Sequence, residues 1–365
     1  MRIVIKLGTS SLTNGTQSIA PSFLIELAKQ IVQLHNCGHQ VVLVSSGAIA
    51  AGREKLNFPQ LPKKLPAKQM LAAVGQPRLM ALYEQVFGLY GLFVAQILLT
   101  RADLSNRRRY LNARNTLSAL IFQKVVAIVN ENDTVATEEI RVGDNDNLSA
   151  LVASLINADI LVLLTDQDGL FTSDPRIDST AELIRVVSEF EIPTSLWQAA
   201  GGSKSGLGTG GMTTKLQAAD LARRSGTTCV IANGNIPDVL VRLIQGEKIG
   251  TQFPALVDSV ESRKRYIMSG RRAPGQLIID EGAELALRRG SSLLSIGVIK
   301  VSGLFDRGDT ICLYNDKGLE IARGISNYSN RDVMQIMHRR SDEIESTLGY
   351  TYGDEVVHRN DLVLL

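Results

Sequence analysis

Short apolar runs alternate with longer helical patterns over the first 250 residues of the chain. The runs predict strands at 2–7, 40–44, 93–99, 125–129, 160–164 and 229–232, and periodic stretches between them predict helices at 23–34, 68–90, 110–123, 148–156 and 214–224. Strands that alternate with helices form parallel sheets. Because the crossovers are right-handed, the helices cover both faces. The predicted fold class is therefore α/β, with a mostly parallel open sheet and helices on both faces.

The pattern changes after Gly250. Residues 257–269 are charged and weakly periodic, and Ala273-Pro274-Gly275 marks a break. Further on, β-rich runs at 298–302, 310–314, 320–325 and 355–358 alternate with glycine turns, which predicts a small barrel-like β domain. A length of 365 residues exceeds the usual size of one core. We expect a first domain at 1–252, a linker at 253–272 and a second domain at 273–365.

The charge balance gives the molecule no global electrostatic field. The chain has 39 basic and 37 acidic residues and a net charge of +2, so nucleic acid or a membrane surface would not be attracted to it as a whole. No apolar run approaches the roughly 18 residues that cross a bilayer. The first residues form a strand pattern rather than a targeting signal. We expect no association with membranes.

Cysteine and histidine are sparse and widely spaced. Cys37, Cys229 and Cys312 contain no Cys-x-x-Cys pair, which disfavours both a disulfide framework and a zinc site and fits a reducing cytoplasm. The four histidines also lack the spacing of metal ligands. We therefore predict no metal site held by the protein's own side chains.

A glycine-rich run at 201–215 leads directly into the predicted helix at 214–224. With so few side chains, the backbone can approach a ligand closely, and the unpaired N–H groups of a helix start bind anions. Lys215 adds a positive charge on the first turn. The spacing is not that of a Walker A loop. The run therefore predicts a phosphate-binding loop, with a flexible surface linker as the alternative.

Polar residues follow several of the predicted strands, and ligands of parallel sheets sit at these carboxyl ends. Lys6 stands at the end of the first strand before a turn of small residues, where a phosphate would fit. Ser46 follows the second strand at a helix start that can hold a small polar ligand. Thr165 and Asp166 follow the fifth, where they could contact a nucleotide. Ordinary turns and a helix N-cap remain the structural alternatives.

The densest polar clusters are 130–134, after the fourth strand, and 142–149. Asn and Asp side chains are suited to binding the ammonium and carboxylate of a small substrate, and Asp146 could orient lysines by ion pairing. Turn formation by the same residues is the alternative. Because turns rarely need two such clusters close together, we favour a binding site.

Taken together, these segments resemble the glutamate 5-kinase family, which has the amino acid kinase fold. The resemblance rests on Lys6-Leu7-Gly8-Thr9-Ser10, Ser46 to Gly52, Asn130 to Asp133, Gly143 to Ala150, Thr165 to Leu170 and Gly208 to Lys215, in this order. It extends over nearly the whole chain, because Ala273 to Gly275, Asp280 to Ala283 and Val356 to Asp361 resemble the PUA domain that this family carries at its C-terminus.

The resemblance implies transfer of the ATP γ-phosphoryl group to the γ-carboxylate of L-glutamate, the first step from glutamate towards proline. It implies that Lys6 and Lys215 neutralise charge on the transferred group while Asp146 organises them. Glutamate would be held by Ser46, Asp133 and Asn145. The nucleotide would contact Lys6, Thr165, Asp166 and the loop Thr209, Gly210, Gly211, Met212, Thr213, Thr214 and Lys215.

The resemblance also implies cofactors and partners. Mg²⁺ would arrive with ATP, since it binds mainly to substrate phosphates and keeps several waters. L-proline would inhibit at or near the glutamate site, the enzyme would be a homo-oligomer, and the labile product would be handed over to a glutamyl phosphate reductase.

Two alternatives compete with this interpretation. An amino acid kinase that acts on another carboxylate, such as aspartate or N-acetylglutamate, would share the fold. RNA binding is the alternative from a different class, because PUA domains of other proteins often contact RNA and basic pairs occur at 271–272, 288–289 and 339–340. Basic pairs are more often a solvated surface, and aromatic residues for base stacking are sparse.

Overall fold

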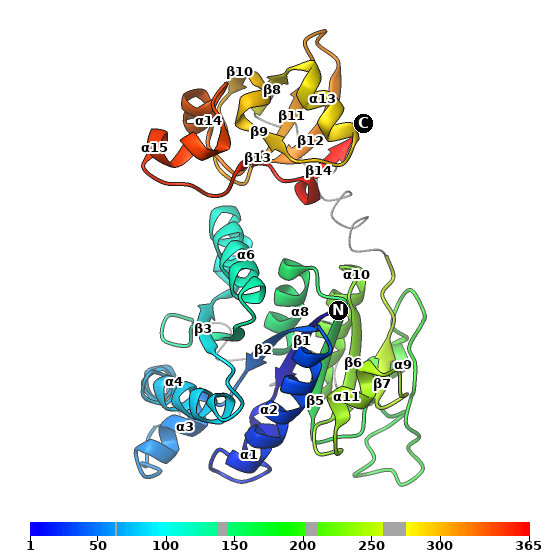
Figure 1. Cartoon of the computed structure of the whole chain (residues 1–365). Helices are drawn as coiled ribbons and strands as arrows, with labels where there is room; N and C mark the ends of the chain where they lie inside the picture. The colour runs from blue at the N-terminus through cyan, green and yellow to red at the C-terminus, as the bar shows by residue number, and fades with distance from the viewer. Residues whose placement is uncertain (63, 137–144, 202–210, 258–274) are drawn as a thin grey trace. The chain divides into compact units, whose positions relative to one another are not determined.

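The computed structural model describes residues 1–62, 64–136, 145–201, 211–257 and 275–365 (Figure 1). The chain divides into two compact units, Met1–Ser105 with Asn112–Asp258, and Asn106–Leu111 with Ser259–Leu365. No helix in the described ranges has both the length and the hydropathy that crossing a membrane would require.

The first unit is built around a seven-stranded sheet with the order β3-β4-β2-β1-β5-β6-β7. All neighbouring pairs are parallel except β6 and β7, which confirms the predicted mostly parallel sheet. The strands are β1 (Arg2–Leu7), β2 (Gln40–Ser45), β3 (Val94–Leu99), β4 (Val126–Glu131), β5 (Ile160–Thr165), β6 (Thr228–Asn233) and β7 (Thr251–Phe253). The antiparallel β7 is the one strand of this sheet that the sequence pattern did not predict.

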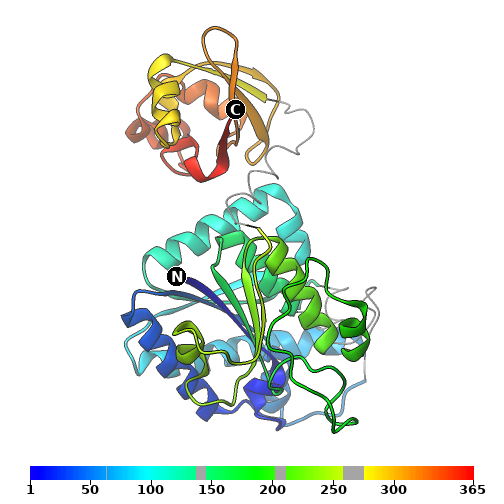
Figure 2. The ribbon, with the colours of Figure 1, turned by 90° about the vertical axis from the view of Figure 1, so that its right-hand side faces the viewer.

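Helices cover both faces of this sheet (Figures 1 and 2). One face packs with α2, α4 and α11 into a core that includes Ile3, Ile5 and Leu43. On the other face, α8 packs on β1 and α10 packs on β6, and the two helices contact each other. The helices are α1 (Thr9–Thr13), α2 (Pro21–Asn36), α3 (Ala48–Lys55), α4 (Leu65–Gly88), α5 (Arg101–Ser105), α6 (Arg107–Phe122), α8 (Asn145–Ile156), α9 (Thr194–Ala199), α10 (Met212–Arg224) and α11 (Val239–Ile244).

The central strand β1 explains why a lysine lies inside this unit. Its residues are buried from Ile3 to Leu7, as expected for a strand covered by helices on both faces. Side chains alternate along a strand, so Ile3 and Ile5 face the α2 side and Lys6 faces the α8 side. Lys6 is only 5% exposed, and a buried ammonium requires a compensating charge.

The second unit is rich in β-strands, as predicted. Its larger sheet has the order β10-β8-β11-β12-β14, and β13 pairs with β9 in a smaller sheet. The strands are β8 (Gly275–Ile279), β9 (Leu293–Leu294), β10 (Val298–Gly303), β11 (Thr310–Tyr314), β12 (Glu320–Ile325), β13 (Glu355–Val357) and β14 (Leu362–Leu364). The sequence pattern missed its helices, α13 (Glu281–Arg288), α14 (Asn330–Ile336) and α15 (Ile344–Leu348). Apolar side chains from both sheets and all three helices form one core.

Two glycines let the backbones of α3 and α4 touch. A Cβ atom on Gly75 would lie 1.8 Å from the carbonyl oxygen of Ala48, and one on Gly52 would lie 1.9 Å from that of Leu71. No side chain fits in either place. The first turn of α3 and the middle of α4 therefore form a rigid pair next to the loop that follows β2.

We predict that Gly75→Ala destabilises the protein by about 1–3 kcal/mol or more, because the added methyl group overpacks this contact. Thermal or denaturant unfolding measures the effect. Gly88→Ala on the same helix is the matched control, since a Cβ there meets no atom within 4 Å, and it should leave stability unchanged or slightly raised. Equal stability of the two variants would contradict the close contact.

Candidate functional site

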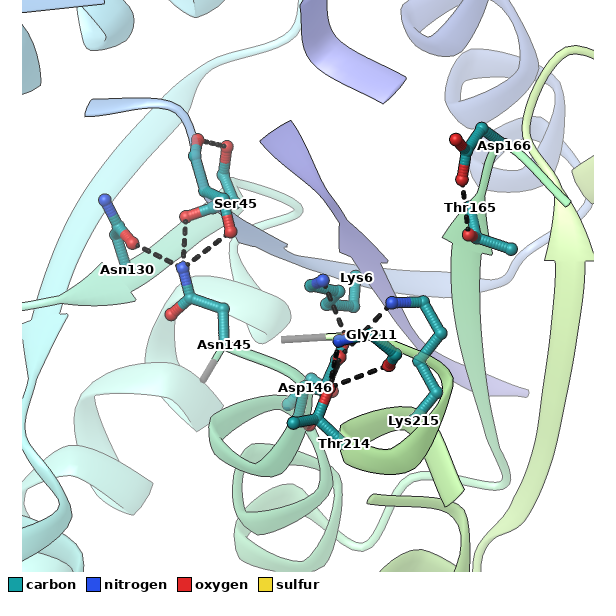
Figure 3. A network of polar contacts seen from close by, with 12 residues as sticks. Lys6, Ser45, Asn130, Asn145, Asp146, Thr165, Asp166, Gly211, Thr214 and Lys215 are labelled. Atoms are coloured by element: carbon teal, nitrogen blue, oxygen red, sulfur yellow. Dashed lines mark hydrogen bonds and ion pairs between the residues drawn. The ribbon is translucent and has the colours of Figure 1, made fainter. Parts of the chain in front are cut away.

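Polar side chains gather where the carboxyl ends of four neighbouring strands, β4, β2, β1 and β5, meet the N-termini of α8 and α10 (Figure 3). This is the edge at which parallel sheets bind ligands, because the strand-end loops open there and the helix N-termini present unpaired N–H groups. These are the loops in which the sequence predicts a binding site, and the described residues form two connected clusters there.

Asp146 is the centre of the first cluster. Its Oδ1 lies 2.6 Å from Lys6 Nζ, and its Oδ2 lies 3.3 Å from Lys215 Nζ. Thr214 Oγ1 donates a hydrogen bond of 2.7 Å to Asp146 Oδ2. The family resemblance implies that Lys6, Asp146 and Lys215 act together, and the structure brings the three side chains together from β1, α8 and α10.

Burial and charge act in opposite directions on Asp146. Its burial alone would raise the pKa of the carboxyl group, but the ammonium groups of Lys6 and Lys215 outweigh this and lower the pKa to about 2. Burial also lowers the pKa of Lys215, with a further contribution from Lys6, while Asp146 opposes the change. The cluster therefore holds one carboxylate between two cations and keeps one positive charge in excess, which suits an anionic ligand.

The N-terminus of α10 adds backbone donors next to this charge. Gly211 is the N-cap residue, and its N–H donates to Thr214 Oγ1 at 3.2 Å. Thr213 Oγ1 donates to the carbonyl oxygen of Ala200 at 2.9 Å, which ties the start of the helix to the end of α9. The positive end of the helix dipole and Lys215 together favour negatively charged groups such as phosphates.

Asn145 is the centre of the second cluster. Its Nδ2 donates to the Ser45 carbonyl oxygen at 3.2 Å, to Ser46 Oγ at 2.9 Å and to Asn130 Oδ1 at 2.9 Å. Gly47, at φ +99°, makes the turn after Ser46 possible, a conformation that side chains disfavour. Asn145 Oδ1 is buried and accepts no hydrogen bond within the described part of the chain. Such an orphaned acceptor is costly, and it is suited to a donor on a ligand.

The structure adds residues to this cluster that sequence reasoning did not assign. Asn130 is 2% exposed, and its Nδ2 donates to Gln76 Oε1 at 2.8 Å. Gln76 Nε2 in turn donates to Gln96 Oε1 at 3.1 Å. Ser45 Oγ lies 2.7 Å from the buried hydroxyl of Tyr83. Asn130 directly follows the strand predicted at 125–129. Gln76 has only one sequence signal, which is a polar side chain within a predicted helix.

Asp133 lies two residues beyond β4, at the same edge of the sheet. Its pKa is raised by burial to about 6, so the carboxyl group is close to its titration point at neutral pH. Burial removes part of the hydration of the ionised Asp133 carboxylate, and a ligand cation beside it would compensate for that loss.

The other described residues predicted to contact the nucleotide lie at the end of β5 and at the start of α10. Thr165 is buried at the end of β5, and its hydroxyl donates to the exposed Asp166 at 3.1 Å. Figure 3 draws this pair apart from the Asn145 cluster, beyond Lys215. Met212 begins α10. Thr209 and Gly210 lie outside the described residues. Within the described residues, no three His, Cys, Asp or Glu side chains are arranged to hold a metal ion.

Two of the basic pairs in the second unit contain an arginine that is neutralised by a neighbouring carboxylate. Arg288 pairs with Glu284 at 2.8 Å, and Arg340 lies 3.5 Å from Asp342. The pair at 271–272 lies outside the described residues. These ion pairs reduce the positive field that an RNA backbone would need.

Comparisons with known proteins agree with this geometry. Residues 1–233 match the amino acid kinase family and residues 275–348 match the PUA domain. The chain is 54% identical to a glutamate 5-kinase of Photobacterium profundum over 364 residues, which covers 100% of this chain and 96% of that protein. It is 53% identical to a glutamate 5-kinase of Shewanella sediminis, covering 100% and 98%, and 54% identical to one of Vibrio campbellii, covering 100% and 96%.

We predict that Asp146→Asn destabilises the protein by about 3–5 kcal/mol at neutral pH, because two buried cations lose their counter-charge. In the parent protein the pKa of Asp146 is depressed, so its contribution is present above about pH 4 and is lost as the pH falls towards 2. The difference between the two proteins should therefore shrink on acidification, as denaturant unfolding over pH would measure.

Asp174→Asn serves as the control for that experiment. Asp174 is likewise an ion-paired carboxylate, but its partner Arg176 is 76% exposed, and surface ion pairs contribute little. A loss of stability as large as that of Asp146→Asn would contradict the special role of the buried carboxylate.

Proposed function

The chain belongs to the amino acid kinase family, and from this premise we propose that it is a glutamate 5-kinase. It transfers the γ-phosphoryl group of ATP to the γ-carboxylate of L-glutamate and produces L-glutamyl 5-phosphate and ADP, the first step of proline biosynthesis from glutamate. The observation that carries the proposal is the Lys6–Asp146–Lys215 cluster, next to an amide site that offers one unused acceptor. Relatives named for this activity support the choice of glutamate.

The reaction needs positioning and charge neutralisation more than proton transfer. The γ-carboxylate of glutamate, with an ordinary pKa of about 4.3, is already ionised at neutral pH and is itself the nucleophile. One of its oxygens forms a bond to the γ-phosphorus, the bond from that phosphorus to the β–γ bridging oxygen breaks, and ADP leaves with the electron pair. No general base is required, and the main obstacle is the repulsion between two anions.

Lys6 and Lys215 neutralise the negative charge of the transferred phosphoryl group. Both ammonium groups are held by Asp146, so they need no reorganisation when negative charge develops on the phosphoryl oxygens and on ADP. The N–H groups at the start of α10 act in the same direction. Asp146 touches the lysines and orients them, which makes it the organiser of the pair.

Glutamate is held by Ser46, Asp133 and Asn145. The α-ammonium group would donate to Asn145 Oδ1, which accepts from no described residue, and be balanced by the Asp133 carboxylate. Ser46 Oγ, which already contacts Asn145, would offer its hydroxyl to a carboxylate. Proline also has an α-carboxylate and a protonated amine, and on this ground we propose that it inhibits at this site.

ATP contacts Thr165 and Asp166 on one side and the loop Thr209 to Lys215 on the other. Mg²⁺ belongs to the MgATP substrate, since it prefers phosphate oxygens and water as ligands, and it supplies further neutralisation of the β- and γ-phosphates. We also propose a homo-oligomer in the cytoplasm and hand-over of the acyl phosphate to a glutamyl phosphate reductase, because that product is labile in water.

We propose the domain boundaries 1–252 for the kinase domain, 253–272 for the linker and 273–365 for the PUA domain. The start of β8 at Gly275 supports the beginning of the PUA domain. The end of β7 at Phe253 lies one residue beyond the proposed limit of the kinase domain, and the compact units divide at Asp258, with Asn106–Leu111 in the second unit.

The activity is tested by ADP release from MgATP with a panel of acids, and by trapping the acyl phosphate with hydroxylamine. We expect turnover with L-glutamate, its inhibition by L-proline, and little turnover with aspartate or N-acetylglutamate. Preference for either of the other two acids would contradict the assignment of glutamate as the substrate and leave the fold assignment unchanged.

We predict that Lys215→Ala lowers kcat by about 10²–10³-fold, as for the loss of one preorganised donor in other enzymes. The KM for glutamate should change much less, because Lys215 acts on the transferred group. Steady-state kinetics on the folded variant decide the matter, with Lys29→Ala on α2 as the control, since Lys29 is a half-exposed lysine paired with Glu26. A kcat near that of the parent protein would remove Lys215 from the mechanism.

We predict that the KM for glutamate rises as the pH falls below about 6, approaching tenfold per pH unit, while the KM for ATP stays level. The raised pKa of Asp133 is the cause, because the protonated residue cannot balance the ammonium group. The same raised pKa means that the ionised residue opposes folding, so this group does not destabilise the protein on acidification.

Asp133→Asn tests that assignment. The variant should have a high KM for glutamate that no longer changes between about pH 5 and pH 7. A pH profile that survives this substitution would show that another group titrates.

A further inference from the structure

We propose that Gln76, a residue of α4, is a positioning residue for the glutamate site. Through Asn130 it holds the Asn145 amide in the orientation in which Oδ1 has no partner among the described residues and is available to the substrate ammonium group. The inference rests on the proposed function and extends it to a residue that is separated from Asn145 by a second side chain.

The orientation of each amide follows from its partners. The Ser45 carbonyl oxygen can only accept, so the group of Asn145 that faces it at 3.2 Å must be Nδ2. The Glu131 backbone N–H can only donate, so the group of Asn130 that faces it at 2.8 Å must be Oδ1. Asn130 Nδ2 therefore points at Gln76 and needs an acceptor there, which Gln76 Oε1 provides at 2.8 Å.

Gln96, Gln76, Asn130 and Asn145 form a row of hydrogen-bonded amide side chains, and Gln76 is a buried link in it. It is 8% exposed and Asn130 is 2% exposed, so water does not readily replace the bond between them. Gln96, which accepts from Gln76 Nε2, is an exposed residue of the edge strand β3, and water can replace it there. The row thus runs from solvent at the sheet edge to the substrate site, and its buried bonds determine the orientation of the amides.

The backbone around Gln76 is held in place as well. Its neighbour Gly75 touches the first turn of α3 so closely that a Cβ would overlap the Ala48 carbonyl oxygen. α3 begins directly after Ser46 and Gly47. The same rigid contact therefore fixes Gln76 relative to the loop that carries Ser46, the other partner of the Asn145 amide.

Loss of the acceptor at position 76 has a specific consequence. Asn130 Nδ2 would be left buried without a partner, and the Asn130 side chain could recover a hydrogen bond only by rotating away from its present arrangement. Rotation would remove Asn130 Oδ1 from Asn145 Nδ2 and leave the Asn145 amide held only by Ser45 and Ser46. The substrate ammonium would then meet an amide that is less firmly preorganised, whereas the lysines on Asp146 would keep their contacts.

The test is Gln76→Met, which keeps the length of the side chain and removes its acceptor. In the full-length protein we expect the KM for glutamate, and its Kd by calorimetry without ATP, to rise about tenfold, with kcat and the KM for ATP within about threefold of the parent values. Gln76→Glu retains an acceptor oxygen and should restore the KM for glutamate to within about threefold. It also carries the test if Gln76→Met does not fold.

Gln30→Met is the matched control. Gln30 is 4% exposed and accepts from the Leu240 backbone N–H at 2.9 Å, on α2 and away from these clusters. It should lose stability without a change in either KM. An unchanged glutamate KM in Gln76→Met, an equal rise in both KM values, or a tenfold rise in Gln76→Glu would each overturn the proposal. A parent protein that does not phosphorylate glutamate would instead refute the proposed function.

Discussion

One buried carboxylate between two ammonium groups is the interaction on which the site depends. Lys6 and Lys215 are both largely removed from water, so the buried ammonium groups require the counter-charge that Asp146 supplies. The carboxylate compensates one of the two charges and leaves the other for a ligand. A site of this kind can bring a phosphate and a carboxylate together although they repel each other.

The fold brings these groups together by its topology. Lys6 comes from the central strand β1, Asp146 from the first turn of α8 and Lys215 from the first turn of α10, and both helices lie on the same face of the sheet. The acceptor site is built next to it, where Asn145 precedes Asp146 in the chain. Under the proposed function these adjacent residues would serve the two substrates. The row of amides from Gln96 through Gln76 and Asn130 contacts Asn145, the residue proposed to bind glutamate.

The sequence predicted the parts of this site that lie on strand ends. Lys6 stands at the end of an apolar run, and polar clusters directly follow other apolar runs. Because the carboxyl ends of parallel strands meet at one edge of the sheet, these residues could be assigned to one site from the sequence. The contact of Asp146 with both lysines was expected, but its distances and its depressed pKa depend on burial that only the fold creates. Thr209 and Gly210 remain predictions.

Other features had no local signal. Gln76 is one polar residue within a long helical pattern, and its importance depends on Asn130, which lies 54 positions away in the chain. The contact of Gly52 with Leu71 and of Gly75 with Ala48 likewise depends on how two helices cross. The short β7 and the helices of the second unit were missed because tertiary packing, more than a strong periodic pattern, stabilises short elements.

Binding of a transition-state analogue shows whether Lys6 stabilises the transition state more than it stabilises bound ATP. MgADP with aluminium fluoride and glutamate imitates the phosphoryl group in transfer, while a non-hydrolysable MgATP analogue imitates the ground state. For Lys6→Met relative to the parent protein, the account predicts a loss of affinity of about hundredfold or more for the first complex and less than about threefold for the second. Equal losses for both complexes would contradict the claim that the paired cations act on the charge that develops during transfer.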